Sequence, residues 1–262
     1  MEPVTNRGFG SCRFVLASSL TATRSGKYRR SRSRIVGVIT SPADLDFAIR
    51  MGDPPDFFEL RLDRLVHPAS RGHGVATVVD RLEEKISKLR APLIVTARHP
   101  KEGGANRLSS RGRRNLLARF LSHARYIDVE LRSAPFFHSL LRLARKRNVR
   151  RIISVHYLKS TPPSNQLRDK ARAAKRHGAD IFKLATRTDT PAQLTRLLDF
   201  VAANDVDVAV SAMGIGRLGA ASRVLLACCG SALVYVSLGR SDIEGQISLE
   251  QFRALAGAVL KR

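Results

Sequence analysis

The sequence predicts an α/β protein whose eight strand-and-helix units close into a single (β/α)8 barrel. Eight short apolar or β-branched runs follow one another from residue 35 onward, and each leads through a turn into an amphipathic helical stretch. Near-continuous apolar strands that alternate with helices are typical of a parallel sheet covered on both faces. The length of 262 residues also suits one such barrel, which uses roughly 200 to 250 residues.

The expected strands, in chain order, are Ile35–Thr40, Phe57–Asp63, Leu93–Arg98, Tyr126–Leu131, Arg151–His156, Ile181–Thr186, Val208–Met213 and Leu233–Leu238. The expected helices begin at Ser41-Pro42, Val75, Asn106, Ser133, Pro163, Thr190-Pro191, Leu218 and Ser248. Several of these starts combine Ser or Thr with Pro or acidic residues, which N-caps and first helical turns favour.

An open doubly wound sheet is the competing architecture for such alternating elements. Its first strand would usually lead into a Gly-rich phosphate-binding turn. Here the strand Ile35–Thr40 runs into Ser-Pro-Ala-Asp, and no Gly-x-Gly-x-x-Gly motif follows it. The barrel is therefore the favoured fold.

Residues 1–34 differ in composition from the rest of the chain. They carry eight Lys and Arg against the single acid Glu2, and they lack sustained periodicity. A segment of this kind buries too little apolar surface to fold, so we expect a disordered basic leader over 1–34 and the barrel domain over 35–262. The composition also suits an organelle transit peptide, and a mis-called start codon or a basic tail explains it equally well.

The formal net charge of +24 taken alone indicates a polyanionic partner, either nucleic acid or an anionic membrane surface. The distribution of the charge argues against a specific one, because the arginines outside the leader are scattered over expected helix faces. We expect these side chains in solvent, for example those of Arg111, Arg113, Arg114 and Arg119. The prediction is weak, salt-sensitive adsorption without a specific nucleic-acid partner.

Cysteine content and hydropathy indicate the compartment. The three cysteines are Cys12, Cys228 and Cys229, an odd number with an adjacent pair in an apolar helical run, which fits reduced thiols better than disulfides. No apolar run approaches the roughly 18 residues that span a membrane, and no metal-ligand spacing is present. We therefore expect a cytoplasmic protein with no membrane partner and no metal.

Polar side chains gather where the expected strands end, which is where (β/α)8 barrels build their active sites. These side chains belong to Glu59, Arg61, Asp63, Arg98, Glu102, Asp128, Glu130, His156, Lys183, Arg223, Ser241, Asp242 and Gln246. The two-residue period of a strand places Glu59, Arg61 and Asp63 on one face. For Asp63 and Asp128, ion pairs that fill the barrel interior explain the charge equally well.

Lys183 is the most informative of these residues, because it lies inside the apolar strand Ile181–Thr186. Desolvation disfavours the charged form of lysine, so an amine in this setting can be neutral near pH 7 and attack a carbonyl carbon. The alternative is a lysine whose stem packs while its amine reaches solvent. For His156, taken alone, the alternative is a core histidine bonded to backbone.

Seven motifs in order carry a family resemblance. They are Phe-Glu-Leu-Arg-Leu-Asp at 58–63, Thr-Ala-Arg-His-Pro-Lys-Glu-Gly-Gly at 96–104, Ile-Asp-Val-Glu-Leu at 127–131, Ile-Ser-Val-His at 153–156, Gly-Ala-Asp-Ile-Phe-Lys-Leu-Ala at 178–185, Leu-Gly-Ala-Ala-Ser-Arg at 218–223 and Glu-Gly-Gln-Ile-Ser at 244–248. With this order and spacing, residues 35–252 resemble the type I 3-dehydroquinate dehydratases of the shikimate pathway, the Schiff-base-forming class.

The resemblance implies that the chain dehydrates 3-dehydroquinate to 3-dehydroshikimate as a homodimer, without a metal or an organic cofactor. Lys183 would form an imine with the ring ketone of the substrate. His156 would transfer the protons, work for which a group that titrates near neutrality is suited. Glu102 would orient the imidazole and support its charged form.

The resemblance also implies a set of substrate contacts. Arg223 would bind the substrate carboxylate with its planar fork of donors, and Gln246 would close over the same end of the ligand. The residues at positions that contact ring hydroxyls or set the field of the pocket are Glu59, Arg61 and Arg98.

Three positions depart from the family pattern. Tyr157 follows the histidine where the family commonly has an acid, and the loop between Met213 and Leu218 is two residues longer than usual. Asp242 stands where the family has the serine that contacts the substrate, and Ser241 would take over if the loop shifts. An aspartate that faces a carboxylate substrate would be repulsive, so we expect an altered lid.

Two alternative functions fit parts of the same sequence. Another Schiff-base barrel, such as a class I aldolase, would use the same lysine. A degenerate barrel that associates with RNA or a membrane would use the basic leader. The joint presence of Lys183, His156, Glu102 and Arg223 favours the dehydratase, because a decayed site would lose such costly polar groups first.

Overall fold

The computed structural model describes residues 32–66, 75–105, 108–203, 205–239, 241 and 243–260. The expected disordered leader therefore lies outside the described residues, apart from its last three, of which Arg34 begins the first strand. Asp242 and Asn106 also lie outside the described residues.

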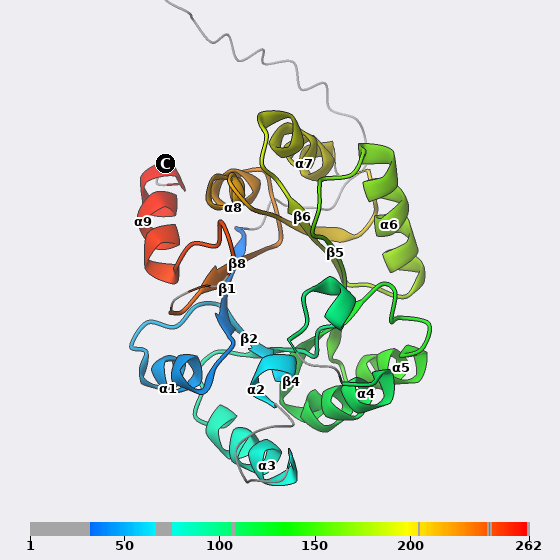
Figure 1. Cartoon of the computed structure of the whole chain (residues 1–262), viewed down its shortest axis with the longest axis vertical. Helices are drawn as coiled ribbons and strands as arrows, with labels where there is room; N and C mark the ends of the chain where they lie inside the picture. The colour runs from blue at the N-terminus through cyan, green and yellow to red at the C-terminus, as the bar shows by residue number, and fades with distance from the viewer. Residues whose placement is uncertain are drawn as a thin grey trace, which may run out of the picture.

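Eight parallel strands form one sheet in the order β7-β6-β5-β4-β3-β2-β1-β8, and Figure 1 shows them around a common centre with the helices outside. The strands are β1 (Arg34–Ile39), β2 (Phe57–Arg61), β3 (Leu93–Thr96), β4 (Ala124–Glu130), β5 (Arg150–Tyr157), β6 (Ile181–Arg187), β7 (Ala209–Ile215) and β8 (Leu233–Ser237). The ring closes where the N–H of Ala232 donates to the carbonyl of Val210 at 2.7 Å and the Ser211 hydroxyl donates to the carbonyl of Leu233 at 3.0 Å. The predicted (β/α)8 barrel is confirmed.

The helices cover the outer face of this ring. They are α1 (Pro42–Arg50), α2 (Leu62–Leu65), α3 (Val75–Ile86), α4 (Ser110–Arg119), α5 (His138–Lys146), α6 (Ser164–Arg176), α7 (Pro191–Ala203), α8 (Gly219–Cys228) and α9 (Leu249–Leu260), with short 3₁₀ helices η1 (Pro100–Glu102) and η2 (Phe120–His123). Within the described residues, none of them combines the length and apolar character needed to cross a bilayer.

Several predicted boundaries are wrong. The helix expected to begin at Asn106 is α4, which begins at Ser110 after the N-cap Ser109. The helix expected to begin at Ser133 is α5, which begins at His138, and the hydroxyl of Ser133 instead donates to Glu130 at 2.9 Å. The second strand ends at Arg61, and Asp63 lies in α2. Asp63 therefore does not share a strand face with Arg61 by alternation.

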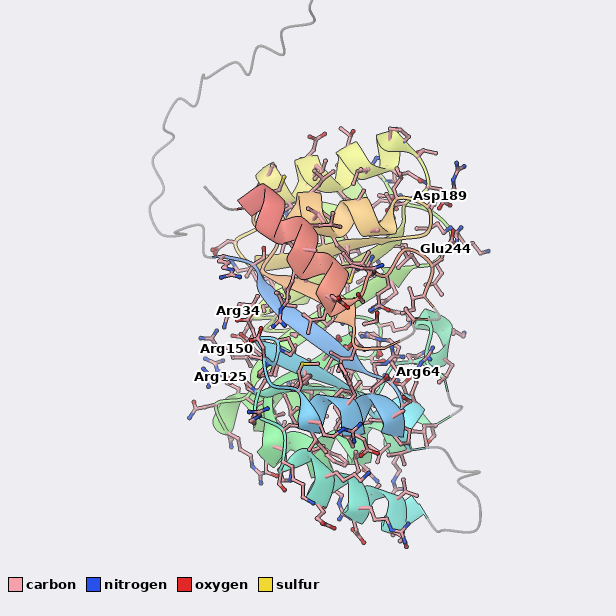
Figure 2. All side chains as sticks on the ribbon, turned by 90° about the vertical axis from the view of Figure 1, so that its left-hand side faces the viewer. Arg34, Arg64, Arg125, Arg150, Asp189 and Glu244 are labelled. Atoms are coloured by element: carbon pink, nitrogen blue, oxygen red, sulfur yellow. The ribbon has the colours of Figure 1, made fainter. Side chains whose placement is uncertain are left out.

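The barrel interior divides into two zones. An apolar zone fills the end where the strands start, with Val36, Phe57, Ile94, Ile152 and Leu233 all buried in one cluster. Figure 2 shows Arg34, Arg125 and Arg150, which lie near strand starts, on one side of the molecule, whereas Arg64, Asp189 and Glu244, which follow strands, lie on the other. The carboxyl ends of the strands therefore meet on a single side, as the barrel prediction requires.

The expectation that Arg113 lies in solvent is wrong, because its side chain is 1% exposed. Its Nε donates to the carbonyl of Ala97 at 2.8 Å, its Nη2 pairs with Glu130, and its guanidinium lies 5.2 Å from the centroid of the Phe137 ring. Glu130 has no exposed surface. Arg113 therefore neutralises a buried carboxylate of β4 on the face of α4 that packs against the barrel.

We predict that Arg113→Ala lowers the free energy of unfolding by about 3 to 5 kcal/mol, because it leaves the buried carboxylate of Glu130 without its partner. Urea unfolding measures the change. Arg111→Ala on the same helix is the control, since Arg111 is exposed, and it should change the value by no more than about 0.5 kcal/mol. Equal stability of the two variants would contradict the proposed ion pair.

Candidate active site

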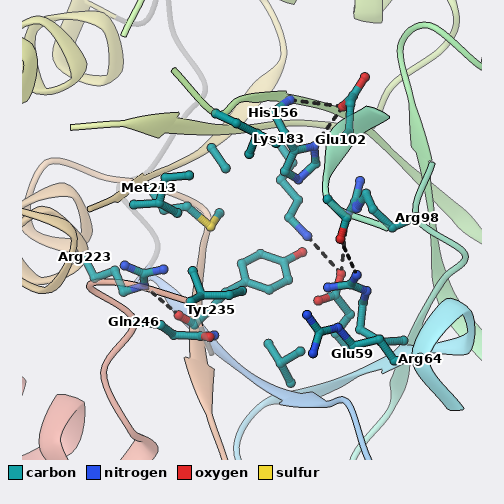
Figure 3. A pocket seen from close by; sticks show the side chains of 17 residues that line it. Glu59, Arg64, Arg98, Glu102, His156, Lys183, Met213, Arg223, Tyr235 and Gln246 are labelled. Carbon is teal, nitrogen blue, oxygen red and sulfur yellow. Dashed lines mark hydrogen bonds and ion pairs between the residues drawn. The ribbon is translucent and has the colours of Figure 1, made fainter. Parts of the chain in front are cut away.

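A cavity of about 320 Å³ opens at the carboxyl ends of the strands. Eight of the ten residues to which the family resemblance assigns a catalytic or substrate-binding role line it, and Figure 3 shows most of them converging from different strands, helices and loops. They are Glu59, Arg61, Arg98, Glu102, His156, Lys183, Arg223 and Gln246. Ser241 lines a smaller neighbouring cavity. The structure therefore brings together side chains that lie as much as 187 residues apart, since Glu59 and Gln246 both line the cavity.

Lys183 lies in the middle of β6 and is 3% exposed. Its Nζ donates to Oε1 of Glu59 at 2.9 Å and to Oδ2 of Asp128 at 3.0 Å, as Figure 3 shows for Glu59. The alternative in which the amine reaches solvent does not hold, because the nitrogen is directed into the barrel. A buried lysine next to a cavity is positioned to meet a ligand carbonyl.

Arg98 forms an ion pair with Asp128, one of the two carboxylates that contact Lys183. Its Nη2 donates to Oδ2 of Asp128 at 2.9 Å, and its Nη1 donates to the Ser154 hydroxyl at 2.6 Å. Burial alone would raise the pKa of Asp128, but Arg98 and Lys183 hold it well below its ordinary value. Asp128 is therefore an ionised partner of two buried cations, which agrees with the ion-pair alternative for this residue.

Asp63 also has a structural role. Arg61 donates to both of its carboxylate oxygens, at 2.9 and 2.8 Å. The backbone N–H groups of Arg98 and Ala105 each donate to Asp63 at 3.1 Å. Burial raises the pKa of this carboxyl, and Arg61 more than offsets that effect, so the pKa lies below its ordinary value. This pair fixes the loop after β3, which carries Arg98 and Glu102.

His156 and Glu102 form a hydrogen-bonded pair at the edge of the cavity. Nδ1 of His156 lies 2.9 Å from Oε2 of Glu102, and the backbone N–H of His156 donates to the same oxygen at 3.1 Å. The Nε of Arg132 lies 3.7 Å from Oε1. With a proton on Nδ1 that faces the carboxylate, Nε2 is left with a lone pair for proton transfer.

The surroundings reverse the ordinary order of the pKa values of Glu102 and His156. Burial, together with the charges of Arg98 and Lys183, lowers the pKa of His156 well below its ordinary value. Burial and the nearby charge of Glu130 raise the pKa of Glu102 to about 7. The imidazole is therefore neutral at pH 7, and its carboxylate partner titrates there.

Arg223 is a buried cation on α8 and is 2% exposed. Its Nη1 donates to the carbonyls of Gly214, Gly219 and Gly245 at 2.8, 2.9 and 2.7 Å, and its Nε donates to the carbonyl of Tyr235 at 3.0 Å. Burial lowers its pKa to about 10. Among the ion pairs of the described residues it has no acidic partner, so the positive charge of Arg223 is available to an anionic ligand.

The loop after β8 is tied to its neighbours. The Ser241 hydroxyl donates to Oε1 of Gln246 at 2.6 Å, and Arg187 of β6 contacts Glu244 at 2.9 Å. Asp242, which the sequence also indicated, lies outside the described residues. Ser241 therefore positions the side chain of Gln246, which lines the cavity.

Tyr235 also lines the cavity, although none of the sequence motifs indicated it. Alternation along β8 places Leu233 and Tyr235 on the inner face and Val234 and Val236 on the outer one. That pattern, with a polar aromatic residue in mid-strand, was the signal that could have found it. Tyr157, the first departure from the family pattern, packs against the outer apolar cluster instead of lining the cavity.

Comparisons with known proteins agree with the geometry. The family model described as Type I 3-dehydroquinase matches residues 43–258. The chain is similar to 3-dehydroquinate dehydratase from Thermodesulfovibrio yellowstonii, with 30% identity over 74% of this chain and 81% of the relative. It is also similar to that from Pyrobaculum aerophilum, with 32% identity over 84% and 69%.

Solved structures share the fold. The crystal structure of 3-dehydroquinate dehydratase from Geobacillus kaustophilus superposes with a TM-score of 0.76 at 23% identity, over 88% of this chain and 93% of that one. The corresponding structure from Aquifex aeolicus gives 0.72 at 25% identity, over 87% and 100%.

Glu102 gives a prediction for stability. Its pKa rises from an ordinary 4.5 to about 7, so the folded protein holds this proton more tightly than the unfolded chain does. The stabilisation is complete below pH 4.5 and is lost as the pH rises through 7. At about 1.4 kcal/mol per pH unit, the loss is on the order of 3 kcal/mol.

We therefore expect the unfolding free energy of the parent, relative to Glu102→Gln, to fall by about that amount between pH 4.5 and pH 8. Urea unfolding at several pH values measures it. Glu84→Gln is the control, because the Glu84 side chain is 74% exposed, and its difference from the parent should not vary in this way. A flat difference for Glu102→Gln would contradict the raised pKa.

Proposed function

Because the chain belongs to the type I 3-dehydroquinase family, we propose that it dehydrates 3-dehydroquinate to 3-dehydroshikimate in the shikimate pathway. The observation that carries the proposal is a single cavity lined by a buried lysine, a histidine–glutamate pair and a buried arginine that has no acidic partner within the described part of the chain. The aldolase and the RNA- or membrane-binding alternatives gain no support from the family match.

Lys183 acts as the nucleophile in this proposal. Its amine, once unprotonated, attacks the ketone carbon of the substrate, and the carbonyl oxygen leaves as water after it takes up two protons. The product is an imine, which in its protonated form withdraws electrons from the neighbouring carbon. Glu59 and Asp128 accept hydrogen bonds from Nζ at 2.9 and 3.0 Å and hold it facing the cavity.

His156 acts as general base and then as general acid. Its neutral Nε2 takes a proton from the carbon next to the imine, and the resulting imidazolium returns a proton to the hydroxyl that departs as water. The Glu102 carboxylate, 2.9 Å from Nδ1, holds the ring in this orientation and supports the charged form. Water then hydrolyses the imine and regenerates Lys183.

Arg223 binds the substrate carboxylate. Four backbone carbonyl bonds fix the guanidinium, and with a pKa of about 10 it stays charged at neutral pH. Ser241 donates to the amide oxygen of Gln246, which leaves the amide NH₂ as a further donor to the carboxylate. The residues proposed to contact the ring hydroxyls or set the field of the pocket are Glu59, Arg61 and Arg98.

Borohydride reduction in the presence of 3-dehydroquinate tests the imine. We expect a mass increase on the peptide that contains Lys183, and we expect Lys183→Ala to lose both this adduct and at least about a thousandfold in kcat. Lys170→Ala is the control, because Lys170 is exposed on α6 and should change neither. An adduct on another residue, or none, would refute the mechanism.

His156→Ala separates imine formation from proton transfer. We expect kcat to fall at least about a hundredfold while a borohydride-reducible adduct on Lys183 is still detected by mass mapping. Near-normal turnover in this variant would remove His156 from the mechanism.

We propose further that the protein is a cytoplasmic homodimer. The odd number of cysteines, with Cys228 adjacent to Cys229, supports a reducing compartment. The exposed apolar side chains of Phe47, Leu225 and Leu255, with 47%, 41% and 48% of their surface in solvent, support a dimer surface, because they lie on α1, α8 and α9, which succeed one another around the barrel (Figure 1).

Sedimentation equilibrium should give twice the 28.9 kDa of the chain, and Leu225→Glu with Leu255→Glu should give a monomer. Phe136→Glu is the control, because Phe136 is 55% exposed and follows β4, away from these helices. A parent that sediments as a monomer at every concentration would rule out the dimer.

A further inference from the structure

Tyr235 lies directly against the amine of Lys183. The Nζ atom is 3.7 Å from the centroid of the tyrosine ring, and Figure 3 shows the ring in the centre of the cavity lining. Tyr235 is 3% exposed, and its backbone carbonyl accepts the hydrogen bond from Arg223. One residue of β8 thus contacts both the proposed nucleophile and the proposed carboxylate site.

The ring face, and not the hydroxyl, makes the contact with Lys183. The hydroxyl oxygen is buried and has no hydrogen-bond partner among the described residues. Burial, with the charges of Glu59 and Asp128, raises the pKa of Tyr235 well above its ordinary value, so the ring is a neutral phenol. A neutral aromatic ring attracts a cation through its face, most strongly where water is excluded.

We propose that Tyr235 is a further catalytic residue, whose ring face stabilises the positive charge on Nζ of Lys183 when that nitrogen is the iminium formed with the substrate. The inference rests on the proposed function, since it requires the imine. In its formation Nζ first passes a proton to the neutral Nε2 of His156, and its freed lone pair bonds to the carbonyl carbon. One N–H proton and the proton that His156 received then pass to the oxygen, and water leaves.

The iminium nitrogen has fewer N–H groups than the free lysine amine, so it needs a source of stabilisation other than hydrogen bonds. In the free enzyme Nζ donates to both Glu59 and Asp128, whereas a protonated iminium nitrogen has one N–H and keeps at most one of these bonds. A ring face needs no N–H donor, so its attraction for the cation persists. Because only the cationic form withdraws electrons strongly, the ring supports proton removal from the neighbouring carbon and therefore kcat.

Three variants separate the ring face from the hydroxyl and from simple packing. Tyr235→Phe keeps the face and should stay within about threefold of the parent kcat. Tyr235→Leu removes it and should lower kcat about thirtyfold with little change in KM. Phe57→Leu is the packing control, because Phe57 is a buried aromatic residue at the apolar end of the same barrel interior and should leave kcat near that of the parent.

The pH dependence of kcat distinguishes the loss of the ring face from a loss of packing, because a loss of packing would leave this dependence unchanged. The loss of the ring face lowers the pKa of the iminium, so the basic limb of kcat should shift to lower pH by about one unit in Tyr235→Leu and stay in place in Tyr235→Phe and Phe57→Leu. If Tyr235→Leu does not fold, pentafluorophenylalanine at 235 keeps the shape and reverses the ring quadrupole, and it should cause the same loss and the same shift.

The inference is overturned if Tyr235→Leu, or the pentafluorophenylalanine variant, keeps the parent kcat and basic limb. It is also overturned if Tyr235→Phe loses as much as Tyr235→Leu, since the hydroxyl would then be responsible. These results differ from a failure of the proposed function, because that failure removes the borohydride adduct on Lys183 in the parent enzyme itself.

Discussion

The structure depends on a network of charges held out of water, in which Lys183 and Arg98 share the carboxylates of Glu59 and Asp128. Each buried ion costs several kcal/mol in lost hydration, and apolar residues of similar volume would often be at least as stable. All four side chains are at most 3% exposed. The network is therefore better explained by the chemistry at Nζ than by a contribution to folding.

The cavity is electrostatically asymmetric, which orients an anionic ligand. At one end Lys183 and Arg98 are matched by acids 2.9 to 3.0 Å away. At the other end the hydrogen-bond partners of Arg223 among the described residues are all backbone carbonyl groups. A substrate with one carboxylate gains most by placing it at Arg223, and its ketone then faces Lys183. The two ends together fix the direction of binding before any lid closes.

The sequence predicted what depends on local pattern and missed what depends on a partner from another element. All eight strands were located because hydrophobic periodicity is local, and the polar strand ends followed from the barrel rule. Arg113 was predicted to be exposed because α4 is rich in charged residues, and the sequence does not show that Glu130 of β4 lies against this face of the helix. Asp63 was placed on a strand because charges at alternate positions mimic one, whereas its bonds to the loop after β3 hold it in α2.

The Glu102–His156 pair explains how one site can both remove and return a proton. In water an imidazole binds a proton more tightly than a carboxylate does, by about two pKa units. Burial raises the pKa of Glu102 to about 7 and lowers that of His156. The proton gained from carbon is therefore held loosely by the imidazole, and its passage to the departing hydroxyl needs little additional driving force.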